Sequence, residues 1–60
     1  MKNKNEVIQD WIEQINNEGV NLTDWEIQFM ESITEQWDKW QRLSDRQEEI
    51  LERIYAEKTS

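Results

Sequence analysis

The sequence predicts an all-α fold, a small three-helix bundle, on three observations. The residues that most disrupt helices are nearly absent: the 60-residue chain has no proline and a single glycine, Gly19. Apolar residues recur at spacings of three and four in three separate segments, which is the pattern of amphipathic helices. Two of these segments open with a hydroxyl residue followed three positions later by Glu or Gln, the signature of a capping box.

The first predicted helix covers about residues 4–18. Its apolar stripe consists of Val7, Ile8, Trp11, Ile12 and Ile15. We expect Gly19 to end this helix in the left-handed conformation, which other residues adopt only at a cost. The sequence leaves open whether residues 1–18 pack in the bundle or form a separable N-terminal helix of the single 1–60 domain.

The second predicted helix covers about residues 24–41. Thr23 is its expected N-cap, and Glu26 is expected to reach back from the N3 position and complete a capping box. Along its apolar face lie Phe29, Met30, Ile33, Trp37 and Trp40.

The third predicted helix covers about residues 45–57 and repeats the same start signal. Ser44 is the expected N-cap and Gln47 its N3 partner. The apolar face consists of Ile50, Leu51, Ile54 and Tyr55. Opposite charges one helical turn apart are expected to pair along the second and third helices: Glu35 with Lys39, Asp38 with Arg42 and Glu49 with Arg53.

The composition excludes several kinds of chemistry. Because the chain has no cysteine and no histidine, it cannot build a Ser-His-Asp or Cys-His nucleophilic site, or an ordinary zinc site. One glycine cannot build a phosphate-binding loop. Carboxylate pairs such as Glu31 and Glu35, or Glu48 and Glu52, lie on faces expected to be solvated, which do not favour general acid–base catalysis. We therefore expect no enzyme activity, no metal site and no cofactor.

Acidic residues outnumber basic ones by fourteen to seven, which gives a net charge of −7. Such a surface repels nucleic acid and anionic membranes, so neither is an expected partner. The charge has two interpretations: it keeps the protein soluble, or it matches a basic groove on a partner protein. The chain has neither the apolar core of a signal peptide nor a run of about 18 apolar residues, so we expect a soluble, cytoplasmic protein.

The chain is rich in tryptophan, with four in 60 residues. Trp11 and Trp37 fit the apolar stripes and are expected in the core. Trp40 falls at a helix end, where core and surface are equally consistent with its position. Trp25 falls at N2 of the second helix and is either a structural residue or an exposed anchor for a partner, because exposed tryptophan is typical of binding hot spots.

Three basic residues lie close to Trp40. Lys39 and Arg42 are explained by their position near a helix end, where cations interact favourably with the helix dipole. Arg46 is not explained in this way, since it lies in the first turn of the next helix. The candidate partner-contact residues are therefore Trp25, Trp40, Arg42 and Arg46.

The second half of the chain contains W-E-I-Q-F at residues 25–29 and L-S-D-R-Q-E-E-I-L-E-R-I at residues 43–54. These two motifs resemble a pattern found in small, mostly uncharacterised helical proteins of tailed bacteriophages and their hosts. In those proteins a W-E-x-x-F helix precedes an L-S-x-x-Q-x-x-h-L-x-x-I helix. The resemblance covers about residues 22–55 and rests on Trp25, Glu26, Phe29, Leu43, Ser44, Gln47, Leu51 and Ile54. It implies a phage-encoded protein and brings no established activity.

A second stretch, L-S-D-R-Q-E-E-I-L-E-R-I at residues 43–54, is similar to the first helix of winged helix-turn-helix domains. In those domains a turn and a recognition helix follow and enter the major groove. Here only Y-A-E-K-T-S follows, so we do not expect DNA binding.

These observations predict a non-enzymatic protein–protein interaction module. The expected protein is a phage-encoded accessory or inhibitor that binds a host or phage protein in the host cytoplasm, through an acidic and Trp-rich helical surface. One alternative is a weak single-stranded nucleic-acid-binding accessory that uses Trp40, Arg42 and Arg46, because such proteins stack bases on aromatic rings beside cations. Another is a self-associating structural module whose Trp face forms a homodimer core.

Overall fold

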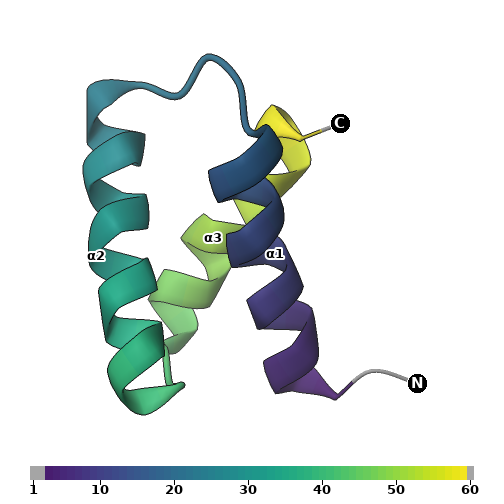
Figure 1. Ribbon diagram of the computed structural model, residues 1–60, viewed down its shortest axis with the longest axis vertical. Helices are drawn as coiled ribbons and strands as arrows, with labels where there is room; N and C mark the ends of the chain where they lie inside the picture. The colour runs from purple at the N-terminus through teal and green to yellow at the C-terminus, as the bar shows by residue number, and fades with distance from the viewer. Residues whose placement is uncertain (1–2, 60) are drawn as a thin grey trace.

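The computed structural model describes residues 3–59, and within that range it contains three α-helices. They are α1 (Lys4–Glu18), α2 (Asp24–Trp40) and α3 (Asp45–Lys58). Figure 1 shows an up-down-up path in which α1 rises, α2 returns beside it and α3 rises again behind both. The predicted three-helix bundle is confirmed, and each helix ends within one residue of its predicted end.

All three helices begin at a side-chain cap. The Thr23 hydroxyl accepts from the Glu26 backbone N–H at 3.1 Å, and the Glu26 carboxylate accepts from the Thr23 N–H at 2.8 Å. Ser44 and Gln47 form the same reciprocal pair at 3.2 and 2.8 Å. The α1 cap was not predicted: Asn3 accepts from the Glu6 N–H at 2.9 Å. Each cap satisfies backbone donors that the first turn of a helix leaves free.

Gly19 ends α1 as predicted, with its backbone N–H donating to the main-chain oxygen of Ile15 at 2.9 Å, but the predicted left-handed conformation was wrong. Gly19 has φ −64° and ψ 137°, an extended conformation that any residue adopts. The left-handed residues are instead Asn21, with φ 59°, and Gln41, with φ 48°. Glycine is required at position 19 for space, because a Cβ there would lie 2.6 Å from the main-chain oxygen of Ile15. The chain turns after α1 at Asn21, and this later turn removes the need for a left-handed glycine.

A single core lies between the helices and draws on all three. α1 packs mainly against α3, so the first helix belongs to the bundle. Trp11 lies at the edge of the core against Tyr55, with ring centroids 5.8 Å apart. The buried apolar residues are Ile8, Ile12, Ile15, Met30, Ile33, Trp37, Leu43, Leu51 and Ile54.

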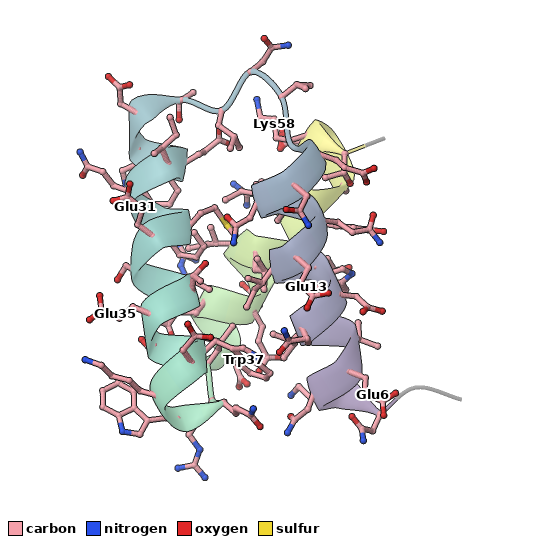
Figure 2. All side chains as sticks on the ribbon, viewed as in Figure 1. Glu6, Glu13, Glu31, Glu35, Trp37 and Lys58 are labelled. Carbon is pink, nitrogen blue, oxygen red and sulfur yellow. The ribbon has the colours of Figure 1, made fainter. Side chains whose placement is uncertain are left out.

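Side-chain hydrogen bonds join α1 to α2 at two places. The indole Nε1–H of Trp37 donates to the Gln9 side-chain oxygen at 2.7 Å, so this buried tryptophan has a partner for its polar atom. Figure 2 shows the Trp37 side chain between α1 and α2. Nearer the other end of α1, the Asn16 amide donates to the Thr34 hydroxyl at 3.1 Å. The two bonds fix the relative position of the helices at both ends of their contact.

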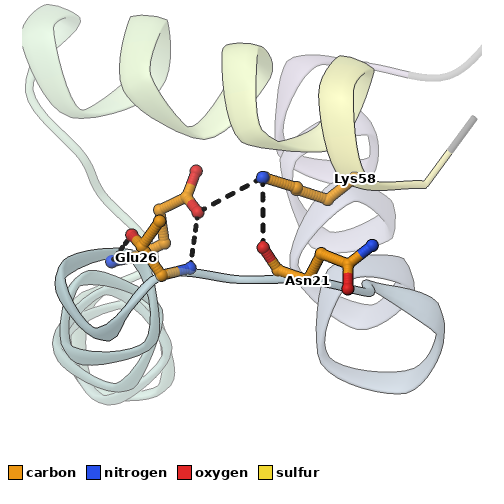
Figure 3. A network of polar contacts seen from close by, with 4 residues as sticks. Asn21, Glu26 and Lys58 are labelled. Carbon is orange, nitrogen blue, oxygen red and sulfur yellow. Dashed lines mark hydrogen bonds and ion pairs between the residues drawn. The ribbon is translucent and has the colours of Figure 1, made fainter.

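A polar network closes the bundle where the α1–α2 loop meets the end of α3 (Figure 3). The Lys58 ammonium donates to the main-chain oxygen of Asn21 at 3.2 Å and lies 3.6 Å from the Glu26 carboxylate. Both charged side chains are largely removed from solvent. The first turn of α2 is therefore held beside the last turn of α3.

Candidate functional site

Among residues 3–59, four large apolar side chains are exposed: Val20, Trp25, Ile27 and Trp40. Single exposed apolar residues are ordinary on protein surfaces and need no function. Trp25 differs because it adjoins both a second aromatic ring and a hollow in the surface. Its side chain is 58% exposed.

Trp25 is positioned by its own helix. It lies four residues before Phe29, so the two side chains occupy the same face one turn apart. Their rings are stacked, with centroids 5.3 Å apart and planes 14° from parallel. Phe29 is half-buried and packs against the core, which gives the exposed indole a rigid base.

A hollow of about 360 Å³ lies beside Trp25 between the start of α2 and the outer face of α3. On the α3 side, Arg46, Ile50, Arg53 and Glu57 recur at spacings of four, three and four, so they form one stripe along the helix. The hollow is lined by Thr23, Trp25, Glu26, Arg46, Glu49, Ile50, Arg53, Ile54 and Glu57. We call Trp25 and Phe29 of α2 together with Arg46, Glu49, Ile50, Arg53 and Glu57 of α3 the Trp25 surface.

The Trp25 surface carries two arginines and two glutamates, and the third glutamate that lines the hollow, Glu26, is paired with Lys58, so the charges balance. Within residues 3–59, neither Arg46 nor Arg53 forms an ion pair, so the pairing predicted between Glu49 and Arg53 does not form. The rest of the chain carries the net charge of −7. Figure 2 shows carboxylates along the outer sides of α1 and α2, among them Glu6, Glu13, Glu31 and Glu35. The Trp25 surface is thus a neutral, partly apolar area on an acidic protein.

The four sequence-predicted contact residues do not all meet. Trp25 and Arg46 line the same hollow. Trp40, 68% exposed, lines a smaller hollow of about 200 Å³, and the Lys39 ammonium lies 5.8 Å from the centre of its ring. Arg42 contributes its main-chain oxygen, which accepts from Gln36 at 2.9 Å, and within residues 3–59 its side chain forms no ion pair. The predicted pair of Asp38 with Arg42 is therefore absent, whereas Lys39 pairs with Glu35 at 3.1 Å.

The sequence reasoning missed the α3 half of the Trp25 surface. Ile50 was placed on the apolar face of the third helix, where it does pack against the core, but its half-exposed side at the hollow was not foreseen. Glu49 and Arg53 were expected to form a helical ion pair. The signal that would have found this surface is the alternation of charge along the Arg46–Glu57 stripe, which lies on one face of α3. Sequence alone does not place that face beside Trp25, because the placement depends on how α2 packs against α3.

One carboxyl group of the hollow has a shifted pKa. The Thr23 backbone N–H donates to the Glu26 carboxylate and holds the pKa of Glu26 below its usual range. Burial of the carboxylate opposes this shift, and the nearby Lys58 ammonium adds to it. A lowered pKa keeps Glu26 ionised, which suits the cap and the ion pair and does not suit a general acid.

Within the described residues 3–59, no three acidic side chains converge in a way that would hold a metal ion. The same part of the chain contains no helix with the length and apolarity needed to span a bilayer. No protein-family model, no curated protein and no solved structure matches the chain.

Proposed function

We propose that this protein is a non-enzymatic protein–protein interaction module that binds its partner through the Trp25 surface. The observation that carries the proposal is Trp25 itself: its indole is 58% exposed, is stacked on Phe29 and stands at the rim of a hollow lined by Ile50, Arg46 and Arg53. Binding hot spots combine these features, because Trp and Arg are enriched among the few interface residues that contribute most of the binding free energy.

The rigidity of the Trp25 side chain supports this assignment. A side chain that is already ordered in the free protein loses little conformational entropy on binding, so more of the contact free energy appears as affinity. Trp25 lies in the first turn of α2, where the Thr23–Glu26 capping box and the Glu26–Lys58 ion pair fix the backbone. The neighbouring network therefore orders the contact residue before a partner arrives.

The partner that fits this surface offers an apolar side chain for the hollow and charges of both signs around it. An accessory or inhibitory role suits a chain of this size. The resemblance to tailed-phage proteins favours a phage-encoded chain whose partner is a host or phage protein in the host cytoplasm.

The test is capture of a tagged chain from bacterial lysate in three forms: wild type, Trp25→Ala and Ile27→Ala. Ile27 is the matched control, since it is an exposed apolar residue of the same helix and lies two positions away, on the other side. We expect one protein to be retained in stoichiometric amount by wild type and by Ile27→Ala, in nuclease-treated lysate, and to be lost with Trp25→Ala.

The captured protein is then purified and its affinity is measured by titration calorimetry. Trp25→Ala should weaken binding by about thirtyfold or more, the effect of removing a hot-spot residue. A partner retained equally by all three forms would contradict the assignment of the Trp25 surface. Capture that disappears after nuclease treatment would instead support the single-stranded nucleic-acid alternative.

A further inference from the structure

The charge pattern of the Trp25 surface identifies one occupant that fits it: a second copy of the same surface. Along α3 the charged residues alternate in sign in the order Arg46, Glu49, Arg53 and Glu57. In a two-fold dimer the same patch meets itself, so each residue i faces a residue j and the reverse. An alternating pattern is complementary to itself when the two helices run antiparallel.

The register of this pairing follows from residue numbers. A two-fold axis that crosses α3 between Leu51 and Glu52 places Arg46 opposite Glu57 of the second copy. If the two-fold axis moves by less than one residue along α3, to Leu51, Arg53 lies opposite Glu49 of the second copy. Ile50 lies near the axis in both cases. We propose that the Trp25 surface binds a second copy of this chain, with the two α3 helices antiparallel; this inference rests on the surface assignment made in the proposed function.

Trp25 has a defined place in this dimer. The ion pair between Glu26 and Lys58 holds the start of α2 beside the end of α3. The antiparallel arrangement therefore carries Trp25 of one copy toward the beginning of α3 in the other, where Arg46 lies. Arginine over the face of an indole is a favourable cation–π contact, and it forms twice across the two-fold axis.

The distribution of charge over the whole chain favours this face over the others. A molecule with a net charge of −7 repels its own copies wherever acidic faces meet. The Trp25 surface is formally neutral, so two copies approach there with the least repulsion. The faces that carry Glu6, Glu13, Glu31 and Glu35, labelled on the single chain in Figure 2, would then remain on the outside of the dimer.

The experiment uses two charge-reversed forms of the full chain. The acidic variant is Arg46→Glu/Arg53→Glu, and the basic variant is Glu49→Arg/Glu57→Arg. Each variant places like charges opposite each other in its own dimer, whereas a mixture of the two restores opposite charges. The matched control is Glu18→Arg/Glu31→Arg, which makes the same charge change as the basic variant at exposed positions outside the Trp25 surface.

Sedimentation velocity from about 1 µM to about 1 mM reports the assembly state. We expect wild type and the control to approach twice the monomer mass of 7.4 kDa, each variant alone to associate about a hundredfold more weakly, and the equimolar mixture to recover a dimer. Circular dichroism checks that every form is helical. If a charge variant does not fold, Trp25→Ala is measured in its place, with Ile27→Ala as its control. We expect Trp25→Ala to self-associate more weakly than Ile27→Ala.

A wild-type chain that stays monomeric throughout this range would overturn the dimer, and so would variants that each associate as strongly as wild type. Neither result bears on capture of a different protein through Trp25. Sedimentation therefore tests the dimer, whereas the capture experiment with Trp25→Ala tests the proposed function, so failure of one is distinguished from failure of the other.

Discussion

The side-chain amides of Gln36 and Gln47 donate to each other across the α2–α3 contact, each with an N–O distance of 3.1 Å. The same Gln47 oxygen also accepts from the Ser44 backbone N–H at 2.8 Å, in the capping box of α3. One side chain thus starts a helix and fixes that helix to its neighbour. The Gln36 amide also donates to the main-chain oxygen of Arg42 at 2.9 Å, and this bond holds the loop between α2 and α3.

Replacing Gln47 should therefore cost more than removing an ordinary cap residue. We expect Gln47→Ala to lower the free energy of unfolding by about 1–3 kcal/mol, because it removes the reciprocal half of the capping box and leaves Gln36 without its interhelical partner. Urea denaturation measures the change. The control is Gln28→Ala, an exposed position on α2 that should stay within about 0.5 kcal/mol of wild type. Equal stability of the two variants would show that the amide pair contributes nothing.

Trp37 should depend on its hydrogen bond to Gln9 as well as on its apolar ring. Trp37→Phe removes the indole donor, leaves the Gln9 oxygen without its partner at the α1–α2 contact, and opens a small gap in the core. We expect a loss of about 1–3 kcal/mol in unfolding free energy. Trp40→Phe makes the same chemical change at a side chain that is 68% exposed and should be nearly neutral. A Trp40 effect as large as that of Trp37 would contradict the placement of the two rings.

Replacing Gly19 by alanine and replacing Gln41 by glycine should change the free energy of unfolding in different ways. Gly19→Ala should destabilise by about 1–3 kcal/mol, because its Cβ would lie 2.6 Å from the Ile15 oxygen and the end of α1 must shift. Gln41→Gly should be stabilising or neutral, since Gln41 has φ 48° and glycine relieves the cost of that left-handed conformation. Thermal unfolding of both variants tests the pair. A Gly19→Ala variant as stable as wild type would contradict the close approach of position 19 to Ile15, and a destabilising Gln41→Gly would contradict the left-handed conformation of Gln41.

Acid should weaken the capping box of α2 and, to a smaller extent, the ion pair from α2 to α3, through protonation of Glu26. The pKa of Glu26 in the folded protein lies below its unfolded value of about 4.5, so the unfolded chain binds the proton more readily. The stabilisation is fully present above that unfolded value and is lost as the pH falls from about 4.5 through the lowered folded pKa.

The measurement is unfolding free energy against pH for wild type and Glu26→Gln. Glutamine retains an oxygen for the Thr23 N–H and cannot titrate, so its curve should fall less steeply over this acidic window. Asp24→Asn is the control, because Asp24 lies in the same first turn and is exposed. Parallel curves for wild type and Glu26→Gln would contradict the assigned role of the carboxylate.

Much of the fold is readable from the sequence because its signals are local. The Thr23–Glu26 and Ser44–Gln47 boxes depend on residues three positions apart, and both form. The apolar stripes likewise identify most of the buried residues. The signal for Gly19 was local too, and it failed because the left-handed turn occurs two residues later, at Asn21.

The candidate site was only half predictable, for a physical reason. Trp25 stands out in the sequence, and its stacking on Phe29 follows from helical spacing. Its neighbours Arg46 and Ile50 come from α3, and their approach depends on interhelical packing that no local pattern specifies. Proximity in sequence grouped Arg46 with Trp40 and Arg42, whereas packing places Arg46 and Trp40 in different hollows.

The central claim is that the Trp25 surface is a protein-binding surface. The most direct test is to measure how accessible the Trp25 indole is to solvent when other proteins are present. Hydroxyl-radical footprinting with tandem mass spectrometry compares oxidation of Trp25 in dilute purified protein and in concentrated nuclease-treated lysate. Trp11, which packs at the α1–α3 side against Tyr55, is the internal reference. A several-fold fall in Trp25 oxidation relative to Trp11 is the predicted result, whether the occupant is a second copy or another protein. An unchanged ratio would contradict a binding role for the Trp25 surface.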